Sequence, residues 1–354
     1  MGLEGLRLGL TYDDVLLVPR RSTIRSRGTV DLTTRLSRNI ELALPVVAAN
    51  MDTVTEHEMA TALAGLGAVG IIHRFLPSHA HAAEIERVKA ADPSYLVGAA
   101  VGTDHDMLDR AKACVAAGAD VLVLDIAHGH ADHAIDGVKL LKDTFADVDV
   151  IAGNVATAAG AVDLAAAGAD AIKVGVGPGG VCTTRLVAGV GVPQLTALSD
   201  VVAADVGVPI IADGGIKTSG DIAKALAVGA DTVMIGSLFA GTKESPGEVE
   251  STSRGLVKRI RGMASREAVE HRARRAGEEL DDEYFEHRAP EGVEGTVPYK
   301  GQVSQVVGQL MAGVKSSMSY LDATDLATFR ANAAFIQVTG AGIRENSPHA
   351  TQTG

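Results

Sequence analysis

Residues 173–185 read Lys-Val-Gly-Val-Gly-Pro-Gly-Gly-Val-Cys-Thr-Thr-Arg and hold Cys182, one of only two cysteines in 354 residues. Four glycines precede this cysteine, and a loop of that composition lets the backbone approach a ligand closely. A thiol beside backbone N–H groups and the guanidinium of Arg185 is in a setting that favours the nucleophilic thiolate. The alternative is a glycine turn that carries a small buried hydrophobe, because free cysteines are usually buried and inert.

Two more glycine turns, Asp213-Gly214-Gly215 and Gly236-Ser237, directly follow apolar runs late in the chain. Backbone N–H groups in such turns, after the last two strands of a barrel, commonly bind phosphate. Glycine turns also occur without phosphates, so the turns alone leave both interpretations open.

The elements that must position these residues are eight short apolar runs, separated by segments with helical spacing such as residues 104–118 and 158–168. Continuous apolar runs are typical of strands buried on both faces. Strand–helix alternation repeated eight times predicts an α/β fold, a (β/α)8 TIM barrel. A doubly wound sheet is the alternative, and the lack of GxGxxG after the first strand counts against it. The runs are residues 45–49, 69–73, 95–101, 121–125, 148–152, 171–174, 209–213 and 232–235.

An internal repeat supports the barrel. Ala-Gly-Ala-Asp precedes two of the runs, at residues 117–120 and 167–170, and residues 228–231 repeat it with Val first. Each glycine is expected to end a helix before the next strand. Polar residues follow the runs, and in a barrel they meet at the C-terminal face, where active sites lie. They include Asn50, Asp52, His73, Asp125, His128, His130, Asn154, Asp213 and Ser237.

After the eighth run the regular pattern stops, and residues 248–300 are highly charged. We interpret residues 264–300 as a mobile flap beside the active face, with a solvated excursion as the alternative. Helical spacing returns at residues 301–320. The tail at 337–354 is rich in Gly, Thr and polar residues, and we expect it to be partly disordered or docked on a neighbour. We expect one catalytic domain over residues 1–354.

The composition excludes several classes of protein. A net charge of −12 repels phosphate backbones, so we expect no nucleic-acid partner. No apolar run reaches the roughly 18 residues of a membrane span, and the N-terminus lacks a signal pattern, so we expect a cytoplasmic protein and no membrane partner. Two cysteines make no disulfide framework and indicate a reducing compartment.

Several ordered segments then carry a more specific pattern. They are residues 11–17 (Thr-Tyr-Asp-Asp-Val-Leu-Leu), 175–185, 212–216, 236–237, 261–263, 291–295 and 297–301. In this order they resemble the family of IMP dehydrogenases and GMP reductases over nearly the whole chain. The loop at 175–185 is similar to the catalytic loop of that family, which usually has Ser where this chain has Gly180. Ile260 also departs from the family, in which tyrosine is common at this place.

The resemblance implies a (β/α)8 barrel that binds a purine 5′-nucleotide, GMP or IMP. It implies that Cys182 attacks C2 of the purine to form a covalent adduct, which exchanges hydride with a nicotinamide cofactor. Thr184 and Glu291 resemble the pair that relays a proton to or from the departing group. This chemistry is consistent, since a thiolate adds to an electron-poor ring carbon and a nearby acid protonates a poor leaving group.

The resemblance also implies binding residues. The backbone at Gly215, Gly236 and Ser237 would hold the phosphate, Asp213 the ribose hydroxyls, and Met51 with the 262–263 turn the base. The family further implies a homotetramer and a monovalent cation, potassium, near the cysteine loop. The implied sets are Met51, Asp213, Gly214, Gly215, Gly236, Ser237, Gly262, Met263 and Ser265 for the substrate, Asp125 and Asn154 for the cofactor, and Gly175, Gly177 and Cys182 for potassium.

Members of the family catalyse one of two reactions. The reductase expels ammonia from GMP and reduces the adduct with NADPH to IMP, and three features of this chain favour it. Typical dehydrogenases insert a regulatory pair of small domains where this chain has only about residues 81–92. Residues 48–54, at the end of the first predicted strand, resemble the reductase sequence at that place. Dehydrogenases use an Arg-Tyr pair on the flap to activate the hydrolytic water, whereas this chain reads Asp282-Glu283-Tyr284-Phe285.

Other features favour the alternative, an IMP dehydrogenase without regulatory domains that uses NAD and water to make XMP. Residues 125–130 and 290–295 look more like bacterial dehydrogenases, and residues 262–265 lie between the two patterns. A third possibility is a nucleotide-sensing homologue that kept the pocket without turnover; the intact Cys182, Thr184 and Glu291 argue against it. We predict a GMP reductase that uses NADPH.

Overall fold

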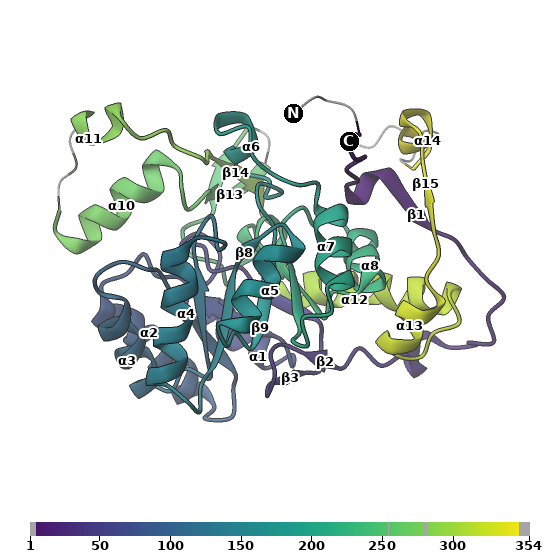
Figure 1. Ribbon diagram of the computed structural model, residues 1–354, viewed down its shortest axis with the longest axis horizontal. Helices are drawn as coiled ribbons and strands as arrows, with labels where there is room; N and C mark the ends of the chain where they lie inside the picture. Colours follow the sequence, from purple (N-terminus) through teal and green to yellow (C-terminus); the bar gives the residue numbers. More distant parts are fainter. Residues whose placement is uncertain (1–4, 254, 279, 281, 347–354) are drawn as a thin grey trace.

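A closed barrel of eight parallel strands forms the centre of the molecule (Figure 1). The structure is a computed structural model and describes residues 5–253, 255–278, 280 and 282–346. The strands follow the chain order around the barrel, and β11 closes on β4. All eight predicted apolar runs lie on these strands, so the predicted (β/α)8 barrel is confirmed. The strands are β4 (Val46–Ala48), β5 (Val69–Ile72), β6 (Val97–Val101), β7 (Val121–Asp125), β8 (Asp149–Val155), β9 (Ala171–Val174), β10 (Ile210–Asp213) and β11 (Thr232–Ile235).

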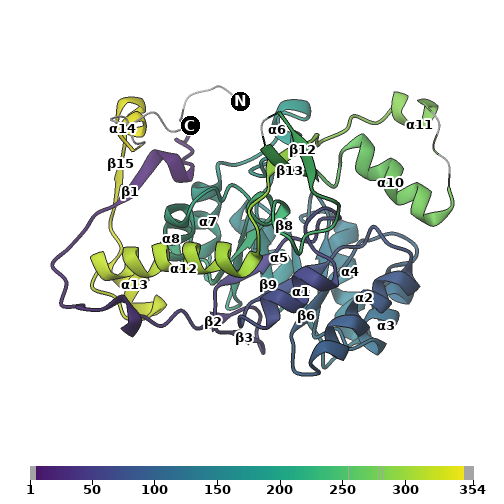
Figure 2. The same cartoon turned by 180° about the vertical axis from the view of Figure 1, so that it is seen from behind.

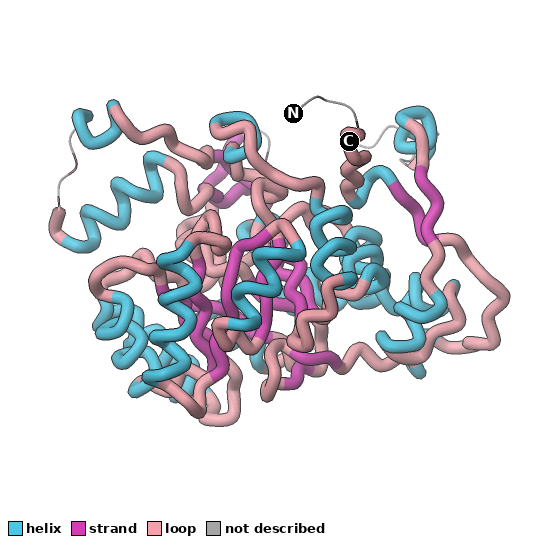
Figure 3. The backbone as a smooth tube through the Cα atoms, viewed as in Figure 1, coloured by secondary structure: helices cyan, strands magenta, loops and turns pink. Residues whose placement is uncertain are grey.

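Helices surround the barrel on the outside (Figure 3). The Ala-Gly-Ala-Asp segments lie between α3 and β7 and between α5 and β9, and the related segment lies between α8 and β11, as predicted. Helix α12 (Val303–Tyr320) packs against both α8 and α1 and so completes the ring after β11 (Figure 2). The other surrounding helices are α1 (His57–Ala64), α2 (Ser78–Ala91), α3 (Met107–Ala116), α4 (Asp132–Thr144), α5 (Ala158–Ala166), α7 (Gln194–Ala203) and α8 (Ser219–Val228). The one-turn helix α6 (Thr184–Val187) follows Cys182 and lies above the barrel (Figures 1 and 2).

The barrel interior is a packed apolar core. Alternate strand residues such as Val47, Val121 and Ile211 point inward and are fully buried, while their neighbours face the helices. The short hairpin of β2 (Thr34–Arg35) and β3 (Glu41–Leu42) adds Leu36 and Leu42 to this inner cluster. Apolar side chains therefore fill the barrel, and polar groups are left to its C-terminal end.

The charged region after β11 contains more regular structure than the sequence indicated. Helix α9 (Ser237–Ala240) is followed by an antiparallel sheet of β12 (Glu250–Thr252), β13 (Gly255–Arg261) and β14 (Glu294–Pro298). β13 reads Gly-Leu-Val-Lys-Arg-Ile-Arg, and its three charged residues interrupt the continuous apolar run that would indicate a buried strand. Helices α10 (Arg266–Ala276) and α11 (Asp282–Glu286) extend from this sheet to one side of the barrel (Figure 1).

The two ends of the chain meet in a small ribbon. Strand β1 (Val15–Leu17), preceded by η1 (Tyr12–Asp14), pairs antiparallel with β15 (Phe335–Gln337). Helices α13 (Leu326–Asn332) and α14 (Gly340–Glu345) flank β15, and η2 (Arg27–Thr29) follows β1. The last part of the predicted tail, residues 347–354, lies outside the described residues. Across the described part of the chain, every helix is too short or too polar to span a bilayer.

Candidate active site

Two adjoining cavities lie at the C-terminal end of the barrel, and they are lined by five of the nine polar residues named above, Asn50, Asp125, Asn154, Asp213 and Ser237. Asp52, His73, His128 and His130 line neither cavity. The first cavity has a volume of about 270 Å3 and the second about 290 Å3. Both are lined by Met51, Val181 and Asp213, which therefore form the wall between them. The two cavities separate the predicted residues into two groups.

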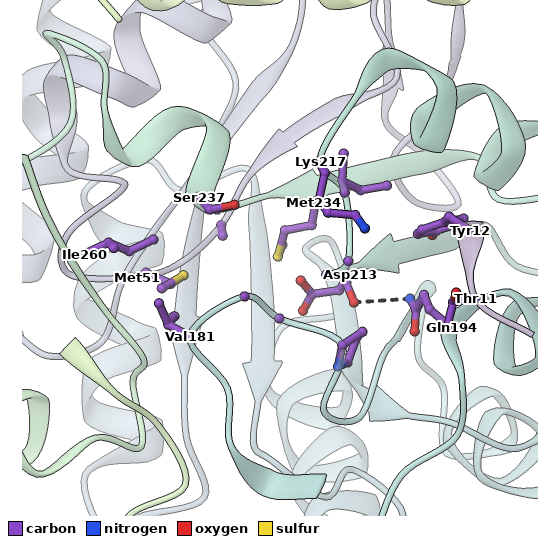
Figure 4. Close-up of a pocket in the computed structure, with 18 of the residues that line it drawn as sticks. Thr11, Tyr12, Met51, Val181, Gln194, Asp213, Lys217, Met234, Ser237 and Ile260 are labelled. Atoms are coloured by element: carbon purple, nitrogen blue, oxygen red, sulfur yellow. Dashed lines mark hydrogen bonds between the residues drawn. The ribbon is translucent and has the colours of Figure 1, made fainter. Parts of the chain in front are cut away.

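The first cavity holds the predicted substrate residues (Figure 4). Its apolar wall consists of Met51, Val181, Met234 and Ile260, and the Gly214-Gly215 and Gly236-Ser237 turns also line it. The side chain of Gln194 donates to the carbonyl oxygen of Asp213 at 3.2 Å and holds the end of β10 (Figure 4). The predicted residues that line it are Met51, Asp213, Gly214, Gly215, Gly236 and Ser237.

The second cavity holds the predicted catalytic and cofactor residues. Cys182, Thr184 and Glu291 come from two segments more than 100 residues apart and line this one cavity. The Sγ atom of Cys182 lies 3.2 Å from Oγ1 of Thr184. Asp125 and Asn154 line it as well, as do Gly262, Met263, Gly175 and Gly177.

Backbone hydrogen bonds fix the cysteine loop to the segment that carries Glu291. Thr183 N donates to Glu291 O at 3.0 Å, and Val293 N donates to Val181 O at 3.0 Å. Cys182 and Gly292 form an isolated antiparallel bridge. The thiol is therefore held at a fixed place relative to the Glu291 backbone, which is what positioning of a nucleophile and a proton carrier requires.

Two glycines in these loops have no tolerated replacement. Gly175 has φ +153°, and a Cβ there would lie 2.0 Å from Asp213 O. Gly214 has φ +90°, and a Cβ there would lie 2.9 Å from Pro178. The cysteine loop thus packs its backbone directly against the β10 turn, and any side chain at these positions would separate the two.

A buried lysine links the strands below both cavities. Lys173 on β9 is only 2% exposed, and its Nζ donates to Asp125 Oδ1 and to Asp213 Oδ2, each at 2.7 Å. Nζ also donates to Oδ1 of Asn154. Asn154 Nδ2 donates to Asp213 Oδ2 at 2.9 Å, and Asn50 Nδ2 donates to Asp125 Oδ2 at 2.8 Å.

Charge pairing decides the ionisation of this cluster. Burial works against the charged ammonium of Lys173, but the carboxylates of Asp125 and Asp213 outweigh it and raise the lysine pKa above its ordinary value. Burial likewise works against the Asp125 carboxylate, and Lys173 outweighs it and lowers the pKa of Asp125. Both groups are therefore charged at neutral pH. The same lysine holds Asp213, which lines both cavities, and Asp125, which lines the second.

Ser265 is the predicted substrate residue that the structure does not bring to either cavity. Its side chain is fully buried, and its Oγ accepts from Ala268 N at 3.1 Å as the N-cap of α10. Gly262 and Met263 line the second cavity and not the first.

Sequence reasoning assigned no role to Lys173, although it lies inside the segment first singled out. Its signal was a lysine within an otherwise apolar buried strand, Ala171–Val174, where a charge requires partners. It also missed Arg74 and Phe75, which follow β5 and line the second cavity, and Gln194 and Lys217 of the first. The second cysteine, Cys114, is fully buried, and burial raises the pKa of its thiol to about 12, so it is inert.

Comparison with known proteins identifies this arrangement. Residues 9–349 match the family profile described as IMP dehydrogenase / GMP reductase domain. The chain belongs to the IMP dehydrogenase / GMP reductase family. It is 38% identical to the GMP reductase of Leishmania major over 482 aligned positions, covering 98% of each protein. It is 41% identical to the inosine-5′-monophosphate dehydrogenase of Cryptosporidium parvum over 398 positions, covering 99% of this chain and 97% of that protein.

A solved structure supports the family at the level of the fold. GMP reductase from Trypanosoma brucei, in complex with guanosine 5′-monophosphate, superimposes with a TM-score of 0.91 at 36% sequence identity, covering 98% of both chains. As a member of the IMP dehydrogenase / GMP reductase family, the protein is an NAD(P)-dependent oxidoreductase of purine nucleotides. The similar proteins include both reductases and dehydrogenases.

Proposed function

We propose that this protein is a GMP reductase, which converts GMP and NADPH to IMP, ammonia and NADP. The flap is the observation that carries this choice. At the place where a dehydrogenase requires the arginine that activates its hydrolytic water, the chain has Glu283 in α11. A carboxylate cannot supply the fixed cation and donors of a guanidinium. A reductase performs no hydrolysis and does not need that group.

The first cavity supports a purine nucleotide as substrate. The N–H groups of the Gly214-Gly215 and Gly236-Ser237 turns would bind the 5′-phosphate, and the Asp213 carboxylate the ribose hydroxyls. Met51 and Val181 stand between this cavity and the thiol and would direct C2 of the base toward Cys182.

The chemistry begins with addition of the Cys182 sulfur to C2 of GMP. A C–S bond forms, the C2–amino bond breaks, and the amino group needs a proton to leave as ammonia. Thr184, 3.2 Å from the thiol, and Glu291 on the same cavity are placed to relay that proton. When bound, the nicotinamide supplies a hydride to C2. The C–S bond then breaks, and IMP and the thiolate are released.

The second cavity fits the nicotinamide. It lies beside Cys182, is separate from the nucleotide cavity, and carries Asp125 and Asn154 as polar groups for a ribose or a carboxamide. Lys173 holds both side chains in place. We also propose the monovalent cation at the carbonyls of Gly175, Gly177 and Cys182, a homotetramer, and mobility of the flap at residues 264–300, as the resemblance implies.

Overall chain length does not separate the two reactions. In this chain only helix α2 lies between β5 and β6, as expected. However, the Leishmania major reductase aligns over 482 positions and so carries extra residues, whereas the Cryptosporidium parvum dehydrogenase aligns over only 398. Long reductases and short dehydrogenases thus both exist, and the choice depends on the flap.

One contact favours the runner-up, an IMP dehydrogenase. The guanidinium of Arg288 lies 4.0 Å from the ring centroid of Tyr284, so an arginine does accompany the flap tyrosine, from a different position in the sequence. Tyr284 and Arg288 do not line the cavity of Cys182 in the described residues. If they reached it on closure of the flap, Arg288 would take the place of the missing arginine.

An assay with both substrate pairs tests the proposal. We expect consumption of NADPH with GMP, followed by nicotinamide absorbance, and no NADH formation from IMP with NAD. Steady NADH formation from IMP would refute the reductase. Glu283→Arg should then introduce hydrolysis of the adduct to XMP, with Glu286→Arg in the same helix as the matched control. If the unaltered protein makes XMP and Arg288→Ala abolishes XMP formation, the protein is an IMP dehydrogenase and our proposal of a GMP reductase is wrong.

A further inference from the structure

We propose that Asp52 and Arg261 are positioning residues that hold Glu291 in place for proton transfer. Asp52 follows β4 and lies next to Met51, yet it lines neither the first nor the second cavity. The inference rests on the proposed function only in that Glu291 carries a proton, and it holds for either direction of the reaction. It gives a role to a buried carboxylate that the mechanism does not use.

The two side chains form a buried ion pair with more than one hydrogen bond. The side chain of Asp52 is fully buried, and that of Arg261 is only 15% exposed. Arg261 Nε donates to Asp52 Oδ2 at 3.0 Å and to Oδ1 at 3.2 Å, and Nη2 also donates to Oδ2. Such charge-assisted pairs are directional as well as strong, and two buried charges are stable only while this geometry is kept. The pair therefore fixes the distance between the two segments that carry it.

The loop that carries Asp52 is fixed to the barrel. The amides of Val54 and Thr55 both donate to Met51 O, at 2.9 and 3.0 Å, and Thr55 Oγ1 donates to Ala49 O at 2.7 Å. These bonds close the loop directly after β4, so Asp52 has a fixed place relative to Met51, which lines both cavities. The Asp52 carboxylate is therefore an anchor on the barrel.

Arg261 connects this anchor to the segment of Glu291. It is the last residue of β13, it lies opposite Glu294 of β14 in the sheet, and its Nη1 lies 3.8 Å from Glu294 Oε2. Three residues after Arg261, the carbonyl oxygen of Ala264 accepts from Glu291 N at 3.0 Å. The Glu291 backbone is thus bonded to the turn that begins at Arg261.

The Glu291 segment is therefore held from two sides. The cysteine loop holds it through the backbone bonds of Thr183 and Val181, and the Asp52–Arg261 pair holds it on the side of β4. Loss of the second contact leaves the thiol and the nucleotide in place but lets the Glu291 carboxylate move away from the departing group. Proton transfer requires hydrogen-bond distance, so it is sensitive to such a displacement.

Helix α10 brings a second basic side chain to the same carboxylate. His271 Nδ1 lies 3.4 Å from Asp52 Oδ2. Burial and the positive charges of Arg261 and Arg275 lower the pKa of His271, and the Asp52 carboxylate opposes them only in part. His271 is therefore neutral at neutral pH, and Arg261 is the charged partner of Asp52.

The first experiment compares two rates in Arg261→Lys, which keeps the charge and loses the planar, forked donor geometry. The overall rate is kcat for GMP with NADPH, which includes protonation of the departing amino group. The partial rate is hydride transfer from IMP to NADP in a single turnover, which has no amino group to protonate. We expect kcat to fall roughly 10- to 100-fold, with the partial rate and the KM for GMP within about twofold of the unaltered protein. A fall of both rates by the same factor would overturn the proposal.

Arg259→Lys is the matched control. Arg259 lies two residues earlier on β13 and pairs at an exposed site with Glu250 at 2.7 Å and with Glu294 at 2.9 Å. Both rates should stay unchanged in this variant. If Arg259→Lys lowered kcat as much as Arg261→Lys, the effect would belong to the β13–β14 sheet in general, and the role of the buried pair would be refuted.

A second experiment tests whether the two residues act as one unit. Asp52→Asn and Arg261→Met each break the pair, so the double variant should lose no more kcat than the more affected single variant. Losses that multiply would mean that the residues act independently, contrary to the proposal. The unaltered protein is measured first, and steady XMP formation from IMP would refute the reductase alone. In that case the same variants are compared in the first turnover and in steady XMP formation.

Discussion

The buried lysine below the two cavities allows a sharp test of how the site is held together. Lys173→Met removes the ammonium that Asp125 and Asp213 share, while a side chain of similar length stays in the barrel. Both carboxylates remain, now without a cation. The change therefore alters charge with little change in packing.

The magnitude follows from the geometry. At 2.7 Å, an effective dielectric constant of 20 gives about 6 kcal/mol of attraction for each of the two pairs, against which burial costs several kcal/mol per ion. Removing one partner of a buried pair typically costs about 3–5 kcal/mol. The two carboxylates are 22% and 20% exposed, so water screens part of the penalty, and we expect a loss of about 4 kcal/mol in the free energy of unfolding.

The loss should depend on pH. Without Lys173, two nearby carboxylates raise the folded pKa of one of them above its unfolded value. A raised carboxyl pKa favours folding below the unfolded pKa, and that benefit is lost as pH rises through the folded pKa. The difference between the variant and the unaltered protein should therefore shrink as the pH falls from 7 toward 5.

Denaturant unfolding at both pH values measures this difference, at one fixed protein concentration. Lys258→Met is the matched control, because Lys258 is 1% exposed and donates to the carbonyls of Thr242 and Ser245, with no carboxylate hydrogen-bonded to it among the described contacts. The loss in the free energy of unfolding caused by Lys258→Met should not shrink as the pH falls from 7 toward 5. A loss below about 1 kcal/mol in Lys173→Met, or one that stays constant with pH, would refute the argument.

Three further predictions follow from single residues. Cys182→Ala should lower turnover by at least about 10³-fold while GMP still binds, with Cys114→Ala as the control that keeps activity; substantial residual turnover would remove Cys182 from its role. Ser265→Ala should cost about 1 kcal/mol of stability through loss of the α10 cap and leave the KM for GMP unchanged, and a large rise in that KM would restore the predicted substrate contact. The lowered pKa of Asp125 contributes stability that is present above its unfolded pKa and is lost as pH falls through the folded pKa. The free energies of unfolding of Asp125→Asn and of the unaltered protein should therefore differ most near neutral pH and converge below about pH 4. A difference that stays constant with pH would contradict the pairing with Lys173.

The barrel and the grouping of its site residues could be predicted from sequence because both depend on local signals. Buried strands are continuous apolar runs, and polar residues that follow such runs must meet at one end of a parallel barrel. Cys182 and Asp213 were placed in this way. Their meeting with Glu291, which lies far along the chain, came from the resemblance, since no local pattern connects it to the cysteine loop.

The features that escaped prediction depend on tertiary partners. The strand β13 has as many charged residues as apolar ones, and it is held by pairing with β12 on one side and β14 on the other. The ribbon of β1 and β15 joins segments more than 300 residues apart. The resemblance implied Ser265 as a substrate residue, but its hydroxyl caps α10, a competing role that the sequence motif S-x-x-A does not reveal.

The central claim is that Cys182 forms an adduct at C2 that this protein cannot hydrolyse, and one measurement tests it directly. The protein is mixed with IMP and NADP in the absence of ammonia, and NADPH formation is followed by absorbance. Hydride leaves C2 and the purine stays on the sulfur, so a reductase should form at most one NADPH per subunit and then stop until added ammonium releases GMP. Continuous formation of NADPH without ammonium, with XMP as the product, would contradict the account.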